Sequence, residues 1–184
     1  MSVIVLDRDG VINYDSADYI KSADEWIPLP GSMEAIARLC AKGYKVYIAT
    51  NQAGLARGLF TSADLEAMHQ KLQSLVQDEG GEVSGIFFCP HHPDEHCLCR
   101  KPQPGLLDQI QTHSGISIRG MPFVGDSLKD LQAALAINAR PILVRTGNGR
   151  KTEARLGELT SPVEVFDDLL QFANQQEAIP GSSA

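Results

Sequence analysis

Short apolar runs alternate with amphipathic segments along most of the sequence. The apolar runs occupy residues 3–6, 45–49, 86–89, 122–124 and 141–144. Segments with helical periodicity occupy residues 32–42, 62–77, 105–113, 128–137 and 165–174. Continuous apolar runs are typical of strands buried on both faces, and the helices between them supply the crossovers that parallel strands need. The sequence therefore predicts an α/β fold, a doubly wound, Rossmann-like parallel sheet with helices on both faces.

The size and charge of the chain restrict its organisation and its partners. With 184 residues it is expected to form one domain, residues 1–178, followed by a disordered tail, residues 179–184. Its net charge of -7 argues against nucleic acid or an anionic membrane as a partner, because both favour basic surfaces. No apolar run approaches the ~20 residues of a membrane span, and the first residues do not form a signal peptide. We therefore expect the protein in the cytoplasm. A monomer is a separate expectation that does not follow from these features.

One loop of the sequence combines three cysteines with several histidines. It contains a Cys-x-His pair, Cys89 and His91, and a Cys-x-Cys pair, Cys97 and Cys99. In a reducing compartment such a cluster indicates a metal site rather than a set of disulfides. Three thiolates and one imidazole complete a tetrahedral zinc site and leave no position open for water. The loop therefore predicts a structural Zn²⁺ site.

The other histidines and the fourth cysteine receive less specific interpretations. His92 and His96 compete with His91 as the nitrogen ligand of the zinc, although spacing favours His91. His69 and His113 are isolated on predicted helices, where a surface position is expected. Cys40 lies on the apolar face of the helix predicted over residues 32–42, so we expect it in the core.

Acidic and hydroxyl side chains follow three of the predicted strands. Asp7 and Asp9 come directly after the first strand, Thr50 follows the second, and Asp126 follows the fourth. In an open α/β sheet, ligands bind beyond the carboxyl ends of the strands, at the point where the strand order reverses. These side chains should therefore converge. Closely spaced carboxylates favour a hard divalent cation with oxygen ligands, so the pattern predicts Mg²⁺.

Taken together, the strand-end motifs resemble those of the haloacid dehalogenase (HAD) superfamily of phosphatases. Each motif alone is weakly specific, but their order along the chain is highly specific, and the resemblance extends from residue 3 to about residue 145. The motifs are Asp7-x-Asp9-Gly10, Thr50-Asn51, Lys101-Pro102 and Gly125-Asp126-x-x-x-Asp130.

The resemblance implies a role for each motif residue. Asp7 is expected to attack phosphorus and form an aspartyl-phosphate. Asp9 is expected to protonate the leaving oxygen and then to activate the hydrolytic water. Thr50 and Lys101 would hold the transferred phosphoryl group. Mg²⁺ would be bound by Asp7, by the main-chain carbonyl of Asp9 and by Asp126.

The zinc loop narrows the resemblance to two phosphatase families. Followed directly by Arg100-Lys101-Pro102, it is similar to that of the D-glycero-D-manno-heptose 1,7-bisphosphate 7-phosphatases and of the related histidinol-phosphate phosphatases. The first family implies hydrolysis of the 7-phosphate of the heptose bisphosphate during ADP-heptose synthesis for lipopolysaccharide. We see no inserted cap domain, so substrate contacts should come from loops. The expected substrate-binding residues are Asp15, Ser16, Asp18, Asn51, Gln52 and Arg100.

Several alternatives remain open from the sequence. Histidinol phosphate is the alternative substrate, and a phospho-accepting receiver domain is a remote, non-enzymatic alternative that would not need Asp9. Asp130 either orients Lys101 or is a solvated helix residue. Some heptose phosphatases carry a lysine directly after the motif aspartate, whereas this chain has Ser127 there and Lys129 two residues later.

Overall fold

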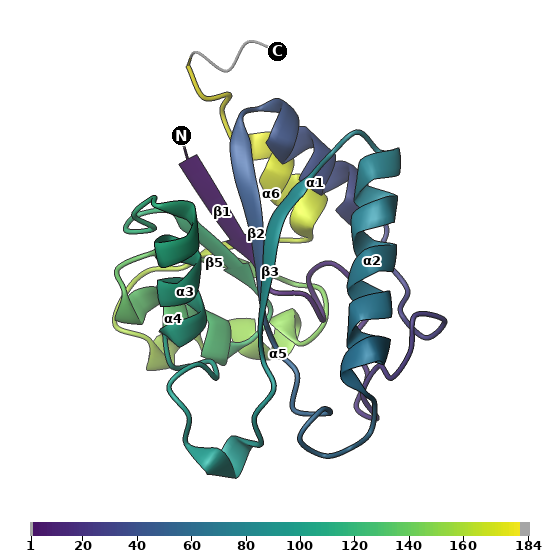
Figure 1. Ribbon diagram of the computed structural model, residues 1–184. Helices are drawn as coiled ribbons and strands as arrows, with labels where there is room; N and C mark the ends of the chain where they lie inside the picture. The colour runs from purple at the N-terminus through teal and green to yellow at the C-terminus, as the bar shows by residue number, and fades with distance from the viewer. Residues whose placement is uncertain (1, 181–184) are drawn as a thin grey trace.

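Six parallel strands form one sheet in the computed structural model, which describes residues 2–180 (Figure 1). The strands are β1 (Ser2–Leu6), β2 (Tyr44–Asn51), β3 (Val83–Cys89), β4 (Pro122–Gly125), β5 (Arg140–Val144) and β6 (Glu164–Phe166). Their order across the sheet is β3-β2-β1-β4-β5-β6. This is the order of doubly wound nucleotide-binding folds. The predicted fold class is therefore confirmed.

Helices cover both faces of this sheet. One face carries α1 (Ser32–Ala41), α2 (Ser62–Asp78) and α6 (Leu169–Gln175), and the other carries α3 (Gly105–Ser114) and α4 (Leu128–Ala136) (Figure 1). A short helix, α5 (Gly149–Glu153), follows β5. Within residues 2–180 no helix has the length and apolar character needed to span a membrane.

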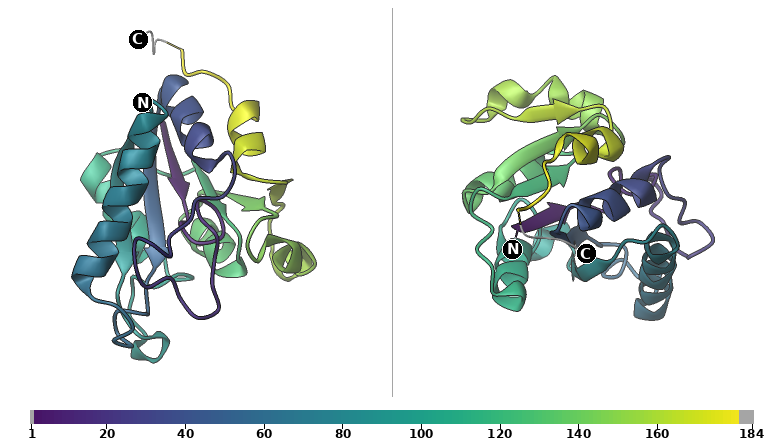
Figure 2. Two further views of the ribbon diagram at one scale, coloured as in Figure 1. Left: turned by 90° about the vertical axis from the view of Figure 1, so that its right-hand side faces the viewer. Right: turned by 90° about the horizontal axis from the view of Figure 1, so that it is seen from above.

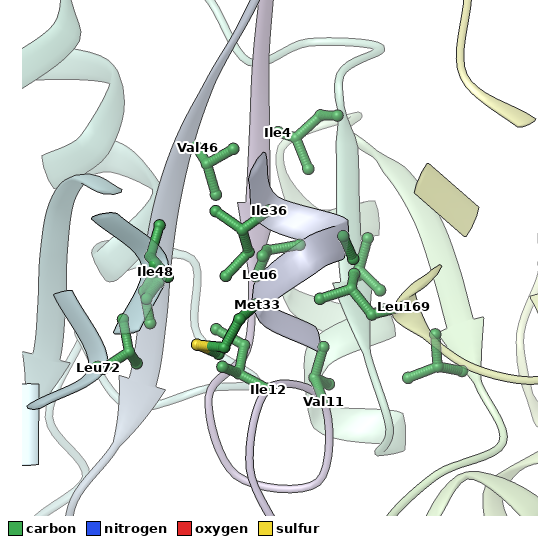
Figure 3. Packing of buried hydrophobic residues seen from close by; sticks show 14 of the residues in the cluster. Ile4, Leu6, Val11, Ile12, Met33, Ile36, Val46, Ile48, Leu72 and Leu169 are labelled. Atoms are coloured by element: carbon green, nitrogen blue, oxygen red, sulfur yellow. The ribbon is translucent and has the colours of Figure 1, made fainter. Parts of the chain in front are cut away.

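The core is divided between the two faces of the sheet because successive strand residues point in opposite directions. In β1, Ile4 and Leu6 pack under α1, together with Ile36 of that helix (Figure 3). Val3 and Val5 point the other way, into the cluster beneath α3 and α4. Burial on both faces explains why the strand appears in the sequence as a continuous apolar run.

The long loop between β1 and α1 is attached to the side of the molecule that carries α2 (Figure 2). Its single tryptophan, Trp26, is fully buried in the core cluster of that face. Lys71 of α2 donates hydrogen bonds from its ammonium to the carbonyl oxygens of Ala23 (2.6 Å) and Trp26 (2.8 Å). These contacts fix a segment that would otherwise have no regular structure to hold it beside the sheet.

The C-terminal region differs from the sequence prediction. The helix predicted over residues 165–174 is wrong at its start, because residues 164–166 form β6 and the helix α6 begins at Leu169. Val165 and Phe166 fit a strand as well as a helix, and the Asp168 side chain starts α6 by accepting a hydrogen bond from the Gln171 amide (2.7 Å). Of the predicted tail, Ile179 donates its amide to the Lys42 carbonyl (2.8 Å). Residues 181–184 lie outside the described residues.

The sheet order determines where a ligand can bind. The order reverses between β1 and β4, since β2 and β3 extend from one side of β1 and β4 to β6 from the other. Helices leave neighbouring strands in opposite directions at such a point and open a crevice at the carboxyl ends of the strands. The segments that follow β1, β2 and β4 therefore meet there.

Candidate active site and metal clusters

A polar crevice lies at the carboxyl ends of β1, β2 and β4. Almost every predicted catalytic and substrate-binding side chain lines it, although these residues come from distant parts of the chain. The lining residues are Asp7, Arg8, Asp9, Asp15, Ser16, Tyr19, Ile20, Thr50, Asn51, Gln52, Arg100, Lys101, Asp126, Ser127, Lys129, Asp130 and Asn148. Asp18 is the one predicted substrate-binding residue that is absent from this lining; it is exposed on the loop outside.

Lys101 lines the crevice and is itself buried. Its buried ammonium contacts one carboxylate oxygen of Asp7 and one of Asp130, each at 2.7 Å, and donates to the Ala49 carbonyl at 2.8 Å. Burial would lower the pKa of Lys101, but Asp130 and Asp7 raise it above its ordinary value. Lys101 is therefore a permanent cation beside Asp7. Asp130 orients it, so of the two alternatives for Asp130 the structure favours this one.

Asp130 also connects the site to the start of α4. Its second carboxylate oxygen accepts hydrogen bonds from the Ser127 amide (3.0 Å) and hydroxyl (2.7 Å), which forms a capping box. One carboxylate thus fixes both the helix terminus and the Lys101 ammonium. Ser127, which occupies the position directly after the motif aspartate, is used by this cap.

Asp126 is held against two glycine-containing turns. The amide of Asn148 donates to one of its carboxylate oxygens at 2.7 Å, and the Thr152 hydroxyl donates to its carbonyl at 2.8 Å. Gly10 (φ 83°) and Gly147 (φ 55°) adopt left-handed backbone conformations, and a Cβ atom at either position would overlap the Asp126 carboxylate. The glycine after the Asp-x-Asp motif is therefore needed for close approach as well as for the turn.

Asp7, Asp126 and Asp130 form an all-oxygen cluster. Their carboxylate oxygens lie within 4.8 Å of one another. Burial, and then the charge of Asp130, raise the pKa of Asp7 well above its ordinary value and that of Asp126 to about 7. The single Lys101 cation does not balance three buried carboxylates. Oxygen donors with excess negative charge fit Mg²⁺, which takes oxygen ligands and retains several waters.

Thr50, Asn51 and Gln52 connect the end of β2 to the other motifs. The Gln52 amide donates to the Thr50 hydroxyl and to an Asp9 carboxylate oxygen, both at 2.9 Å. The Asn51 side chain forms two hydrogen bonds of 3.1 Å with the backbone of Lys101, one to its amide and one to its carbonyl. Asn51 and Gln52 are predicted to bind substrate; what the structure shows is that they form hydrogen bonds with Lys101 and Asp9.

The predicted zinc ligands converge in the loop between β3 and α3. The Cys89 and Cys97 sulfurs are 3.5 Å apart, those of Cys97 and Cys99 3.6 Å apart, and the His91 Nδ1 lies 3.5 Å from the Cys89 sulfur and 3.2 Å from that of Cys99. Tetrahedral Zn²⁺ with ordinary bond lengths separates two sulfurs by roughly 3.8 Å and a sulfur and a nitrogen by roughly 3.5 Å. The donor set and spacing thus fit zinc.

The two competing histidines lie outside this group of four residues. His92 Nδ1 accepts a hydrogen bond from the Asp94 amide (3.3 Å), at the start of the short 3₁₀ helix Pro93–Glu95. His96 follows that helix with a left-handed backbone (φ 49°).

Charged side chains of both signs line the crevice. Asp15 accepts a hydrogen bond from the Asn148 side chain (3.2 Å), and Ser16 follows it in the lining. Arg100 and Lys129 line both this crevice and an adjoining cavity. The Nη1 atom of Arg100 is buried, and among residues 2–180 it has no hydrogen-bond partner. An unpartnered buried donor is costly, so this guanidinium is suited to binding an anion.

Three features of the site are not among those predicted from the sequence. Arg8 is buried between the two motif aspartates and pairs with Asp9. His69 is buried and not on the surface as expected. It shares the apolar face of α2 with Leu65, Met68 and Leu72, so the helical periodicity of the sequence contains the information that it is buried. Asn148, which contacts Asp126, is the third feature. The Gly-Asn-Gly turn at residues 147–149, shortly after a predicted strand, is the sequence pattern that indicates a site residue there.

Known proteins resemble this chain in sequence and in fold. A model for HAD-hydrolase-like proteins matches residues 98–172. The chain is 53% identical over 176 residues to the D-glycero-beta-D-manno-heptose-1,7-bisphosphate 7-phosphatase of Pseudomonas putida, covering 95% of this chain and 99% of that protein. The corresponding Pseudomonas aeruginosa protein is 55% identical over 174 residues, covering 94% and 96%. The crystal structure of D,D-heptose 1,7-bisphosphate phosphatase from Bordetella bronchiseptica, complexed with magnesium and phosphate, has a TM-score of 0.92 and 52% identity, covering 95% and 97%.

The raised pKa of Asp126 predicts how the metal-free protein responds to pH. A carboxyl group whose pKa rises from 3.8 to about 7 on folding destabilises the folded state increasingly as the pH rises through that interval. Asp126→Asn removes this charge. The free energy of unfolding of the variant minus that of the wild type should therefore increase between about pH 4 and about pH 8. Denaturant titrations without metal measure this difference.

The exposed Asp18→Asn variant is the matched control and should show no such trend. Added Mg²⁺ should raise the stability of the wild type, but not of Asp126→Asn, at neutral pH. A difference between wild type and Asp126→Asn that does not change with pH would contradict the electrostatic account.

Proposed function

Because the chain belongs to the D-glycero-β-D-manno-heptose-1,7-bisphosphate 7-phosphatases within the HAD-like hydrolases, we propose that it removes the 7-phosphate of that heptose bisphosphate through an aspartyl-phosphate on Asp7. The enzyme is a phosphoric monoester hydrolase. The observation that carries the proposal is the meeting of Asp7, Lys101 and Asp126 at the carboxyl ends of the strands. The names of the relatives favour this substrate over histidinol phosphate.

In the first half-reaction, an Asp7 carboxylate oxygen attacks phosphorus and the bond between phosphorus and the sugar oxygen breaks. Asp9 gives its proton to the departing sugar oxygen. Lys101, 2.7 Å from Asp7, and the Thr50 hydroxyl neutralise and hold the phosphoryl oxygens. A magnesium ion at Asp7 and Asp126 would add positive charge that keeps these carboxylates ionised and offsets the charge of the phosphoryl group.

In the second half-reaction, Asp9 acts as a base and takes a proton from water. The water oxygen attacks phosphorus, the bond between phosphorus and Asp7 breaks, and inorganic phosphate leaves. The carboxylate nucleophile thus divides one difficult hydrolysis into two displacements. Asp9 ends the first half-reaction without a proton, which is the form that the second requires.

Arg100 is the proposed ligand of the phosphate that is not cleaved. It lies outside the group formed by Lys101 and the three buried carboxylates, and its buried Nη1 atom has no hydrogen-bond partner within the described residues. Lys129 lines the same part of the crevice and adds a second positive charge. Asp15 and Ser16, which line the same crevice, provide acceptors for sugar hydroxyl groups.

The role that we propose for zinc is structural. Cys89, His91, Cys97 and Cys99 would fill its four positions, so water and substrate have none. The zinc loop leads directly into Arg100 and Lys101, and its prolines and polar residues contribute little to the apolar core. A bound metal would therefore fix the backbone that places Lys101.

Phosphate release from a substrate panel tests the function directly. With Mg²⁺, kcat/KM for the heptose 1,7-bisphosphate should exceed that for histidinol phosphate by at least ~100-fold, because buried polar groups left without their partner discriminate strongly. Asp7→Asn should abolish release from every substrate, since an amide is not a nucleophile. Preference for histidinol phosphate would replace the proposed substrate, and turnover by Asp7→Asn would exclude the proposed nucleophile.

The role of Arg100 predicts a selective defect. Arg100→Ala should raise KM for the bisphosphate by about 10- to 100-fold, the usual loss for one charged contact. It should leave KM for the heptose 7-phosphate, which has no distal phosphate, nearly unchanged. Arg119→Ala, on an exposed turn at the opposite end of the sheet, is the control. Equal losses on both sugars would assign Arg100 to positioning of Lys101 instead.

The zinc proposal predicts one Zn²⁺ per chain by elemental analysis. Cys97→Ser should lose the metal, lower the melting temperature and reduce turnover by about 100-fold, because a displacement of ~1 Å at Lys101 is costly. Cys40→Ser removes a thiol from a different part of the chain and should keep the metal and the activity. A Cys97→Ser protein with full zinc content would contradict the ligand set.

A further inference from the structure

Asp9 is held by a buried arginine from the same motif. The Arg8 side chain is 1% exposed, and its guanidinium donates to both Asp9 carboxylate oxygens at 3.0–3.1 Å. Asn13 donates to one of these oxygens at 2.8 Å and Gln52 to the other at 2.9 Å. The carboxylate is therefore surrounded by donors that fix its position from several sides.

His69 lies behind this arginine. It is 6% exposed on α2, and its Nε2 atom is 3.4 Å from the Nη1 atom of Arg8. The ring packs against Phe88 of β3, with 6.0 Å between ring centroids. Burial, and then the charge of Arg8, lower the pKa of His69 to about 4. The imidazole is thus neutral at ordinary pH, and because a guanidinium only donates, Nε2 must be the acceptor.

We propose that His69 is a positioning residue for the acid–base step: through Arg8 it fixes the carboxylate of Asp9 relative to the leaving oxygen. An arginine side chain has many rotamers. Its bidentate contact with Asp9 fixes the planar guanidinium relative to that carboxylate, but does not fix the pair relative to the helices around it. Asp9 contacts its Nε and Nη2 atoms, and His69 contacts its Nη1 atom. The guanidinium is therefore held from both sides.

The rigidity of this arrangement comes from α2. The helix has 17 residues, begins at a Thr61–Asp64 capping box and buries His69 together with Leu65 and Met68. A side chain on such an element defines a position more firmly than one on a loop. His69 thus links the scaffold to Asp9, which otherwise lies on a turn.

The inference rests on the proposed acid–base role of Asp9, and leaving-group chemistry isolates that role. An alkyl phosphate such as the sugar substrate needs a proton on its leaving oxygen, whereas p-nitrophenolate leaves without one. The ratio kcat/KM includes only the steps up to departure of the leaving group, so the later hydrolysis of the aspartyl-phosphate does not enter it. Misplacement of Asp9 should therefore lower kcat/KM for the sugar phosphate selectively.

Two substitutions at one position provide the test. His69→Leu keeps the apolar packing but removes the acceptor, and should lower kcat/KM for the sugar phosphate by about 10- to 100-fold. For p-nitrophenyl phosphate the loss should be less than about 2-fold. His69→Gln supplies an amide oxygen in place of Nε2 and should restore most of the activity. His113→Leu, the same change at an exposed position on α3, should resemble the wild type on both esters.

The outcomes separate this inference from the proposed function. Asp9→Asn in the same assay should show the selective loss, about 10²- to 10⁴-fold on the sugar phosphate. If it does not, the acid role of Asp9 fails, and the inference fails with it. If Asp9→Asn shows the selective loss but His69→Leu lowers both esters equally, or His69→Gln is no better than His69→Leu, the positioning role alone is overturned. Melting temperatures of all variants exclude loss of folded protein as the cause.

Discussion

The site depends on one buried ammonium group. Lys101 is 3% exposed and is surrounded by Asp7, Asp130 and the Ala49 carbonyl, each within 2.8 Å. Removing a charge from water costs several kcal/mol unless partners of good geometry replace the lost hydration. Here the partners come from β1, β2 and α4, so the ammonium can be buried only when these elements are assembled. Lys101 by itself lowers the pKa values of the neighbouring Asp7 and Asp126. Burial, and then the charge of Asp130, outweigh this effect, so both pKa values are raised and the cluster keeps an excess of negative charge. A fold that satisfies Lys101 thus creates a place for a divalent cation.

The position of Lys101 is determined by residues far from it in sequence. It lies on an irregular segment between β3 and α3, where no regular hydrogen-bonding pattern fixes the backbone. Asn51, at the end of β2, binds both its amide and its carbonyl. The cysteine and histidine side chains just before it converge on one point. The cysteine and histidine cluster thus fixes one end of this short segment, and the Asn51 hydrogen bonds fix the other at Lys101. These contacts hold the backbone in the absence of regular secondary structure.

Local patterns in the sequence predicted the parts of the site that local geometry determines. Thr50 lies at the carboxyl end of a strand, and Asp7, Asp9 and Asp126 lie just beyond one. The carboxyl ends of neighbouring parallel strands lie at the same edge of a sheet, so the convergence of these residues follows from topology. An isolated histidine on a helix predicts a surface position for His69. Its partner Arg8 is 61 positions away, and only the packing of α2 brings the two together. No periodic pattern in the sequence predicts the path of the loop that carries Asp18. The strand β6 has three residues, too few for a helical and an extended pattern to differ.

The two motif aspartates are separated by one residue but are held by different parts of the molecule. Asp7 contacts Lys101 and lies in the carboxylate cluster on the β4 side of the crevice. Asp9 points away from that cluster, toward Arg8, Asn13 and Gln52. A nucleophile and an acid–base group must approach phosphorus from opposite sides, because attack and departure are in line. Alternation along a strand would place both side chains on one face. The Gly10 turn and the contacts of Arg8 separate them, and the arginine between the aspartates is therefore as much a part of the motif as its two carboxylates.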